Sequence, residues 1–225
     1  MQPSPELIDN YPLMKMKTSL QKSQSALPTQ PLTDDEPEPL TPDVYQQAQP
    51  LVEVFGELAA RQLFSRTWQF RESGIASVEE TVRDNLSSDD YFLKGVQVVS
   101  LTIGDKIIGV ILASMNLLVV ICSEMSPKLS PRDQEDVAQS GGLILSVLVE
   151  KLGDNLIKAR KGADEAILAM SRCPAFGVKL VVDALTKAGP KKVGSKSTNS
   201  NKQTAGKYNT LYKILQDSSR VKLQK

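Results

Sequence analysis

The chain has no histidine among its 225 residues, and this absence narrows the chemistry that is open to it. Histidine is the commonest general base, a frequent metal ligand and the side chain that titrates near neutral pH. The only cysteines, Cys122 and Cys173, form no CxxC motif, so they predict no metal site and are interpreted as small buried residues of a reducing compartment. Motifs of the GxGxxG, Walker A, GxSxG and HExxH types are also missing, so neither an enzyme nor a cofactor is predicted.

Long apolar runs are missing as well. A membrane-spanning helix needs about 20 apolar residues. The most apolar stretch, Ile107 to Cys122, is shorter and contains Ser114 and Asn116, so a buried core helix is favoured over a membrane-inserted segment. The N-terminus lacks an apolar core of signal-peptide length, so no secretory signal is expected. A membrane is therefore not a predicted partner.

The formal net charge is only +1, but the charge is spread unevenly along the chain. Residues 1–43 are acidic and rich in Pro, Ser, Gln and Thr, which predicts a disordered linker. Residues 190–206 are predicted to be a basic flexible linker, and residues 207–225 to hold one further amphipathic helix. The basic tail is read either as a solvated segment or as one that attracts an acidic surface. Its few aromatic residues indicate no specific nucleic-acid reader.

Residues 44–189 are predicted to form helices throughout, and these helices form a repeat. Three segments, beginning at the predicted helix N-caps Ser65, Asp105 and Asp154, align without gaps at spacings of 40 and 49 residues. Positions nine and thirteen residues further on share one helical face. They hold Gly74, Ser114 and Ala163, and then Val78, Leu118 and Ile167. Helix pairs at about 40–47 residues are typical of HEAT repeats, so the predicted fold is all-α, a HEAT-repeat α-solenoid with disordered termini.

Charged residues of the turns are predicted to brace this array. Arg160 follows Asp154 by six positions, and Arg71 takes the matching position in the first repeat. Such an arginine is expected to reach an aspartate of its own or a neighbouring turn, which would build a ladder of ion pairs. Ile111 takes this position in the second repeat, so the ladder is expected to be interrupted there. The predicted structural residues are Arg71, Glu72, Asp105, Asp154 and Arg160.

The run SRTWQFRE, Ser65 to Glu72, resembles the first repeat of TOG domains, the tubulin-binding HEAT arrays named after tumour overexpressed gene. The longer run PLVEVFGELAARQLFSRTWQFRE, with EPEPLTPDVYQQAQ before it, is similar to one branch, the ciliary-tip family of the centrosomal protein of 104 kDa. The resemblance covers roughly residues 36–190. Because TOG domains hold more repeats than this chain, we expect a fragment, a short isoform or a truncated paralogue with a partial TOG-like array.

The resemblance implies a non-enzymatic module that binds tubulin or microtubule ends. It also implies a place in the cytoplasm and cytoskeleton, at a centrosome, centriole or cilium, with ciliary-tip or centriolar proteins as further partners. The turns of TOG domains line up along the edge that meets tubulin, so the implied contacts are Trp68, Arg66, Lys106, Asn155 and Lys158. From the residues alone, the tryptophan is also read as interhelix packing and each lysine as a solvated charge. A HEAT-type scaffold without tubulin binding is the alternative.

Overall fold

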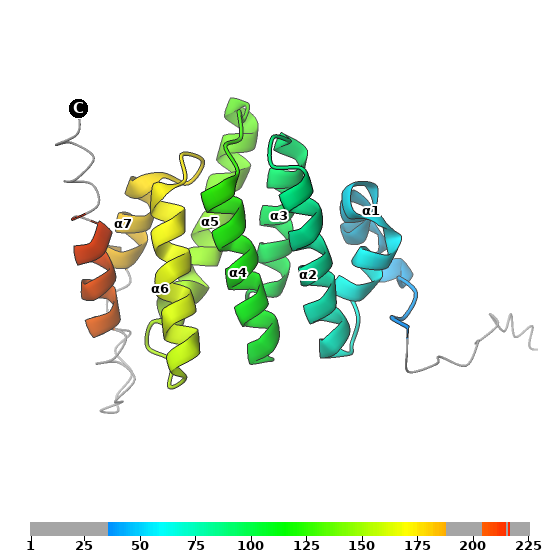
Figure 1. Cartoon of the computed structure of the whole chain (residues 1–225), viewed down its shortest axis with the longest axis horizontal. Helices are drawn as coiled ribbons and strands as arrows, with labels where there is room; N and C mark the ends of the chain where they lie inside the picture. The colour runs from blue at the N-terminus through cyan, green and yellow to red at the C-terminus, as the bar shows by residue number, and fades with distance from the viewer. Residues whose placement is uncertain (1–35, 188–203, 215, 217–225) are drawn as a thin grey trace, which may run out of the picture. The chain divides into compact units, whose positions relative to one another are not determined.

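A computed structural model describes residues 36–187, 204–214 and 216, and all regular structure in this part of the chain is α-helical (Figure 1). The prediction of an all-α fold is confirmed. The helices are α1 Pro42–Leu63, α2 Trp68–Asp84, α3 Asp89–Thr102, α4 Ile108–Glu124, α5 Pro131–Lys151, α6 Ile157–Arg172 and α7 Gly177–Lys187, followed by a helix over residues 204–214.

The helices form consecutive antiparallel pairs that stack side by side in two layers. In Figure 1, α2, α4 and α6 lie in one layer, and α1, α3, α5 and α7 lie in the other. Each helix packs against its pair partner and against the neighbouring helix of its own layer. This is the α-solenoid that the repeat predicted, and it buries one continuous core between the layers.

The predicted repeat positions supply the contact between the layers. All six are buried, and Val78, Leu118 and Ile167 are fully excluded from solvent. A Cβ atom added to Gly74 would lie 2.9 Å from the Cβ of Gln62, so the small residue there is what allows α1 and α2 to approach. In the second repeat the hydroxyl of Ser114 donates to Thr102 over 2.7 Å, which satisfies a polar group inside the core.

Helix α4 contains the most apolar stretch of the chain, and it is a core helix. Residues on all of its sides are buried, because α2, α3 and α6 pack around it. Within the described residues, no helix combines the length and the apolar character that crossing a bilayer requires. The apolar composition of this stretch therefore reflects its central place between the neighbouring repeats.

The first helix begins at Pro42 and is kinked at Gly56, which has φ 84° and ψ 162°. Only glycine adopts this region without strain, so the kink is encoded in the sequence. Residues 36–41 belonged to the predicted linker, yet Glu38 lies against the end of this helix. Its carbonyl accepts a hydrogen bond from Arg61 over 3.3 Å, and its carboxylate accepts one from Ser65 over 2.6 Å. The prediction of disorder is therefore wrong for this short segment; residues 1–35 lie outside the described residues.

The terminal helix begins at residue 204, three residues before the predicted boundary, and it packs beside α6 (Figure 1). The carboxylate of Asp164 in α6 accepts a 2.6 Å hydrogen bond from Thr210 and forms an ion pair with Lys213. Ile214 is buried in the common core. The basic linker predicted over residues 190–206 therefore ends too late by these three residues, and residues 217–225 lie outside the described part.

Candidate interaction edge at the repeat turns

The turns that join α1 to α2, α3 to α4 and α5 to α6 share one backbone geometry. In each turn the side chain of the first repeat position accepts a hydrogen bond from the backbone N–H two residues later. The donors and acceptors are Thr67 to Ser65 at 3.0 Å, Ile107 to Asp105 at 2.8 Å, and Leu156 to Asp154 at 2.9 Å. The three aligned sequence segments therefore share the same hydrogen bond in their turns.

This geometry corrects the predicted helix starts. Ser65, Asp105 and Asp154 are not N-caps, because they lie two residues before the observed caps. Those caps are Thr67, Ile107 and Leu156, and none of them makes a side-chain capping hydrogen bond. The polar side chain lies two residues before the cap, and its hydrogen bond stabilises the turn as in an Asx or Ser/Thr turn.

Two arginines close the first and third turns in the same way. Nη1 of Arg71 donates to the carbonyls of Ser65 and Arg66, both at 3.0 Å. Nη1 of Arg160 donates to the carbonyls of Asp154 and Asn155, at 2.7 and 3.0 Å. Each guanidinium therefore satisfies carbonyl groups that precede its own helix, which makes the turn rigid.

Arg71 also links the first turn to the second. Its Nε and Nη2 atoms donate to the two carboxylate oxygens of Asp105 at 2.7 and 3.1 Å. Burial raises the pKa of Asp105, but the Arg71 hydrogen bond and charge and the N–H of Ile107 outweigh it and leave the pKa below its usual value. Ile111, at the matching position of the second repeat, is buried and offers no cation to the third turn.

Two further acidic residues lie at the turns, Asp154 in the third turn and Glu72 near the first. Asp154 pairs with Lys151 over 3.3 Å, and the backbone N–H of Leu156 is the main cause of its lowered pKa. The carboxylate of Glu72 lies beside Gly109, whose added Cβ would meet it at 3.3 Å. Gly109 is in the first turn of α4, so the negative charge of Glu72 faces the positive end of that helix.

The three turns lie at one end of the helix pairs (Figure 1), and the residues proposed from the sequence as partner contacts are in these turns or in the first two residues of the helices that follow. Trp68 is the first residue of α2 and is 40% exposed, which fits an accessible side chain better than a packing residue between helices. The other four are also exposed. They are Arg66, Lys106, Asn155 and Lys158.

Sequence reasoning missed the apolar residues of the same turns. Ile107 is 36% exposed, Leu156 is 51% exposed and Ile157 is 61% exposed. Aliphatic side chains in a helical repeat are normally counted as core, so their residue type alone points inward. The alignment of the repeats held a signal for one of them. Ile157 follows Asp154 by three residues, as Trp68 follows Ser65, so the alignment placed Ile157 at the position of the exposed tryptophan.

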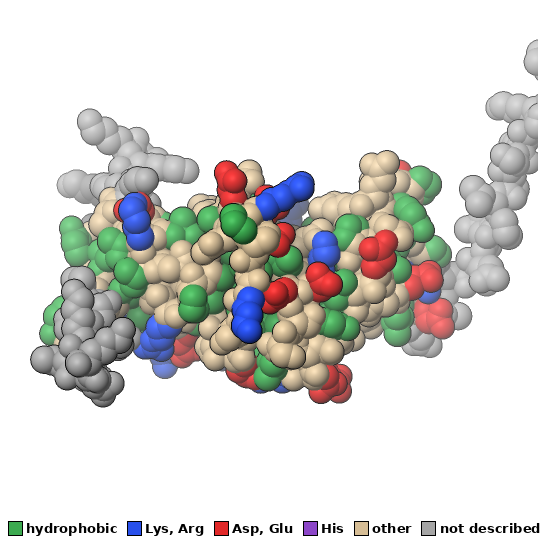
Figure 2. Space-filling view, turned by 90° about the horizontal axis from the view of Figure 1, so that it is seen from above, with side chains coloured by type: hydrophobic (Ala, Val, Ile, Leu, Met, Phe, Trp, Pro, Cys, Tyr) green, Lys and Arg blue, Asp and Glu red, His purple; other side chains and the backbone are tan. Residues whose placement is uncertain are grey.

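The opposite end of the helix pairs differs in character. Figure 2 shows that end, where Lys and Arg side chains are interspersed with Asp and Glu side chains. Arg83, near the end of α2, pairs there with Glu79 and with Glu124 at the end of α4. This cluster of charges is thus paired within the chain, whereas at the turn edge exposed apolar side chains lie beside Lys106 and Lys158.

The two cysteines, distant in sequence, come together in the fold. Cys122 in the last turn of α4 and Cys173 at the end of α6 are both buried. The hydrogen bond between them raises the pKa of Cys122 and lowers that of Cys173 to about 7. Within the described residues, no three side chains of His, Cys, Asp or Glu gather in a way that could hold a metal ion.

Comparison with known proteins places this chain in a family. The family model for the TOG domain of centrosomal protein CEP104 matches residues 45–216. The human centrosomal protein of 104 kDa is 26% identical in an alignment of 144 residues that covers 60% of this chain and 15% of that protein, so the chain spans a small part of this relative.

Two solved structures are similar in fold. The TOG domain of human Cep104 superposes with a TM-score of 0.59 at 24% identity, covering 81% of this chain and 70% of that domain. A structure titled CEP104 TOG domain gives a TM-score of 0.51 at 21% identity, covering 82% and 87%. At these identities the structures establish the solenoid fold, and the family model adds the membership. The chain belongs to the CEP104 TOG-domain family.

Proposed function

We propose that this chain binds tubulin through the edge formed by its three repeat turns. The observation that carries the proposal is the repetition of one rigid turn geometry with an exposed apolar side chain in every turn. Trp68, Ile107 and Ile157 present that apolar surface in the first, second and third turns. Exposed apolar side chains held on a rigid backbone lose little conformational entropy on binding, which suits a protein interface.

Trp68 is the proposed anchor of the interface. Tryptophan is enriched at binding hot spots because it buries a large apolar area and also carries an N–H donor. Arg66 stands beside it on the same turn, although the neighbouring Glu38 offsets part of its charge. The carboxyl of Glu38 has a lowered pKa, chiefly through its hydrogen bond from Ser65 and in part through the charge of Arg66.

The turn lysines are proposed to steer the encounter with tubulin. Lys106 and Lys158 are exposed next to the apolar residues, and neither forms an ion pair within the described residues. Cations along an edge raise the association rate with an acidic partner more than they raise affinity. We further propose that the chain acts at microtubule ends, in a centriole or cilium, since its human relative is a centrosomal protein.

A scaffold function is the alternative, and one observation favours it. The terminal helix exposes Tyr208 (69%) and Tyr212 (61%) one turn apart. Such an exposed aromatic face would suit a protein partner other than tubulin.

The direct test is sedimentation or size-exclusion of the purified chain with free tubulin. Trp68→Ala should weaken binding by more than about 1 kcal/mol, roughly fivefold, while leaving the melting temperature nearly unchanged. Tyr212→Ala is the matched control, because it removes a more exposed aromatic side chain away from the turns. Deletion of the tail is a poor control, since it would remove Ile214 from the core. Absence of binding by the intact chain would leave the scaffold function.

A further inference from the structure

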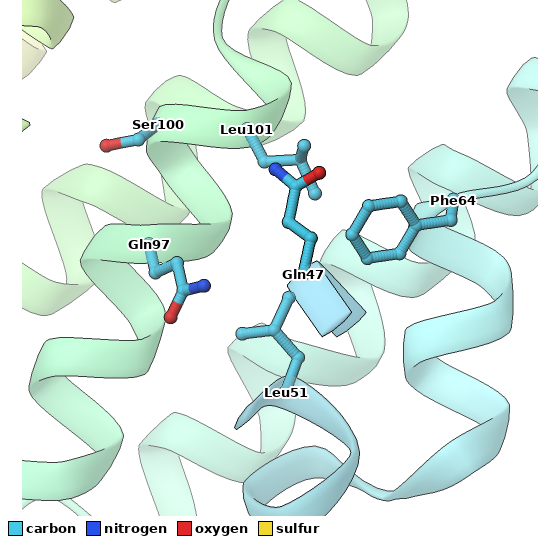
Figure 3. Close-up of a pocket in the computed structure, with 6 residues that line it drawn as sticks. All are labelled: Gln47, Leu51, Phe64, Gln97, Ser100 and Leu101. Carbon is cyan, nitrogen blue, oxygen red and sulfur yellow. The ribbon is translucent and has the colours of Figure 1, made fainter. Parts of the chain in front are cut away.

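A pocket of about 290 Å³ opens between α1 and α3. These two helices belong to the layer of α1, α3, α5 and α7, opposite the layer of α2, α4 and α6. Figure 3 shows the residues that line it. Leu51, Phe64 and Leu101 give it an apolar surface, and Leu51 at its base is almost fully buried. The remaining lining residues are Gln47, Gln97 and Ser100.

The chemistry of the lining restricts the ligand. No Lys, Arg, Asp or Glu side chain lines the pocket. A phosphate, a nucleotide or a carboxylate would therefore find no countercharge to replace its hydration, and a cation would find none either. The volume also lies at or below the range of about 300–1,000 Å³ that is usual for sites of drug-sized ligands. A small, neutral and partly apolar group fits best.

Two carboxamides supply the polar part of the pocket. Gln47 comes from α1 and Gln97 from α3, and in Figure 3 the Nε2 atom of Gln97 is directed toward the space between the two helices. Neither side chain forms a hydrogen bond within the described residues. A carboxamide offers one carbonyl acceptor and one NH2 donor, which is the complement of a peptide group.

We propose that this pocket binds an extended peptide segment of a partner protein, with one large aliphatic side chain inserted between α1 and α3. The aliphatic group would cover Leu51, Phe64 and Leu101. The peptide groups on either side of it would exchange hydrogen bonds with Gln47 and Gln97. Peptide recognition commonly combines such main-chain hydrogen bonds with a side-chain pocket that selects the residue. The proposal does not depend on tubulin binding, because it uses other residues in the other layer.

The probe for this proposal is N-acetyl-L-leucinamide, which is one aliphatic residue flanked by two amide groups. Titration of the isotope-labelled full chain, followed by amide NMR shifts, should give saturable changes at the pocket residues. A ligand of this size making a few contacts is expected to bind with a dissociation constant on the order of millimolar. N-acetylglycinamide, which lacks the aliphatic group, should give no saturable change.

Gln47→Ala tests the hydrogen bonds, and Gln46→Ala is its matched control. Both glutamines are exposed on α1, but only Gln47 lines the pocket. Loss of one hydrogen bond should weaken the probe about five- to tenfold in Gln47→Ala and leave Gln46→Ala unchanged. Equal binding by the two variants would overturn the proposal, as would equal binding of the two probes. A chain that shows no saturable shift with N-acetyl-L-leucinamide would show that the pocket holds water only.

Discussion

Replacement of Arg71 by methionine is the sharpest test of how the turns are held together. Methionine keeps an unbranched apolar stem but lacks the guanidinium group, so the substitution removes all four hydrogen bonds of Arg71. Two of these bonds reach carbonyls of the first turn and two reach Asp105 of the second. The side chains of Arg71 and Asp105 are only 18% and 12% exposed, so solvent compensates little for the loss.

The expected cost follows from what is left behind. Asp105 would keep the N–H of Ile107 but lose its cation, and removal of one partner from a buried ion pair costs about 3–5 kcal/mol. Because the pair is partly exposed, we expect about 2–3 kcal/mol in the free energy of unfolding. For a chain of this size the melting temperature should fall by about 4–12 °C.

The measurement is urea and thermal unfolding followed by circular dichroism, with Arg83→Met as the control. Arg83 also bonds two acidic side chains, but its own side chain is 45% exposed, so its loss should change stability little. A double-mutant cycle of Arg71→Met with Asp105→Asn should give a coupling free energy of about 1–3 kcal/mol. If Arg71→Met were no more harmful than Arg83→Met, the link between the turns would not stabilise the array.

Two further predictions concern packing and pH. Gly74→Ala should lower the free energy of unfolding by about 1–3 kcal/mol, because the new Cβ would lie 3.0 Å from the backbone nitrogen of Leu63. The depressed pKa of carboxylates such as Asp105 contributes stability above their unfolded pKa of about 4. This stability should be lost as the pH falls through their folded pKa values, seen as a lower urea midpoint in acid.

Each of these predictions has its own control. Gly142→Ala introduces the same methyl group into α5 at a site with no atom within 4 Å, so helix propensity alone should stabilise it by about 0.5–1 kcal/mol. Equal effects of the two alanines would refute the close-packing argument. For the acid response, Asp105→Asn should already be destabilised at neutral pH and should lose less stability on acidification. An unchanged pH profile in this variant would contradict the assigned pairing.

The solenoid could be predicted from the sequence because the size and polarity of the residues recur at fixed positions of each repeat. Small residues at one offset and aliphatic residues four positions later can satisfy helix packing in only one register, and Val78, Leu118 and Ile167 are fully buried accordingly. The helix starts were placed two residues early, because the same polar residue types favour N-caps and turns of the kind seen at Asp105.

The candidate interaction edge was harder to predict than the fold. The residue type isoleucine does not distinguish an exposed turn position from a core position. Ile157 was therefore overlooked, although its side chain is 61% exposed. Pairing across repeats was easier to anticipate, because the matching arginine positions suggested a contact with an aspartate of the same or a neighbouring turn; Arg71 pairs with Asp105, 34 residues away. The pocket between α1 and α3 depends on where two helices separate, which periodicity does not encode.

The most direct test of the proposed tubulin edge compares two exposed aliphatic residues. Ile157 is 61% exposed in the third turn, and Leu143 is 64% exposed on α5, away from the turns. Tubulin binding by Ile157→Ser and Leu143→Ser should be measured beside the intact chain, with melting temperatures for all three. The proposal predicts weaker binding for Ile157→Ser, and binding like the intact chain for Leu143→Ser. Equal binding by both variants would contradict the proposal that the repeat turns form the tubulin-binding surface.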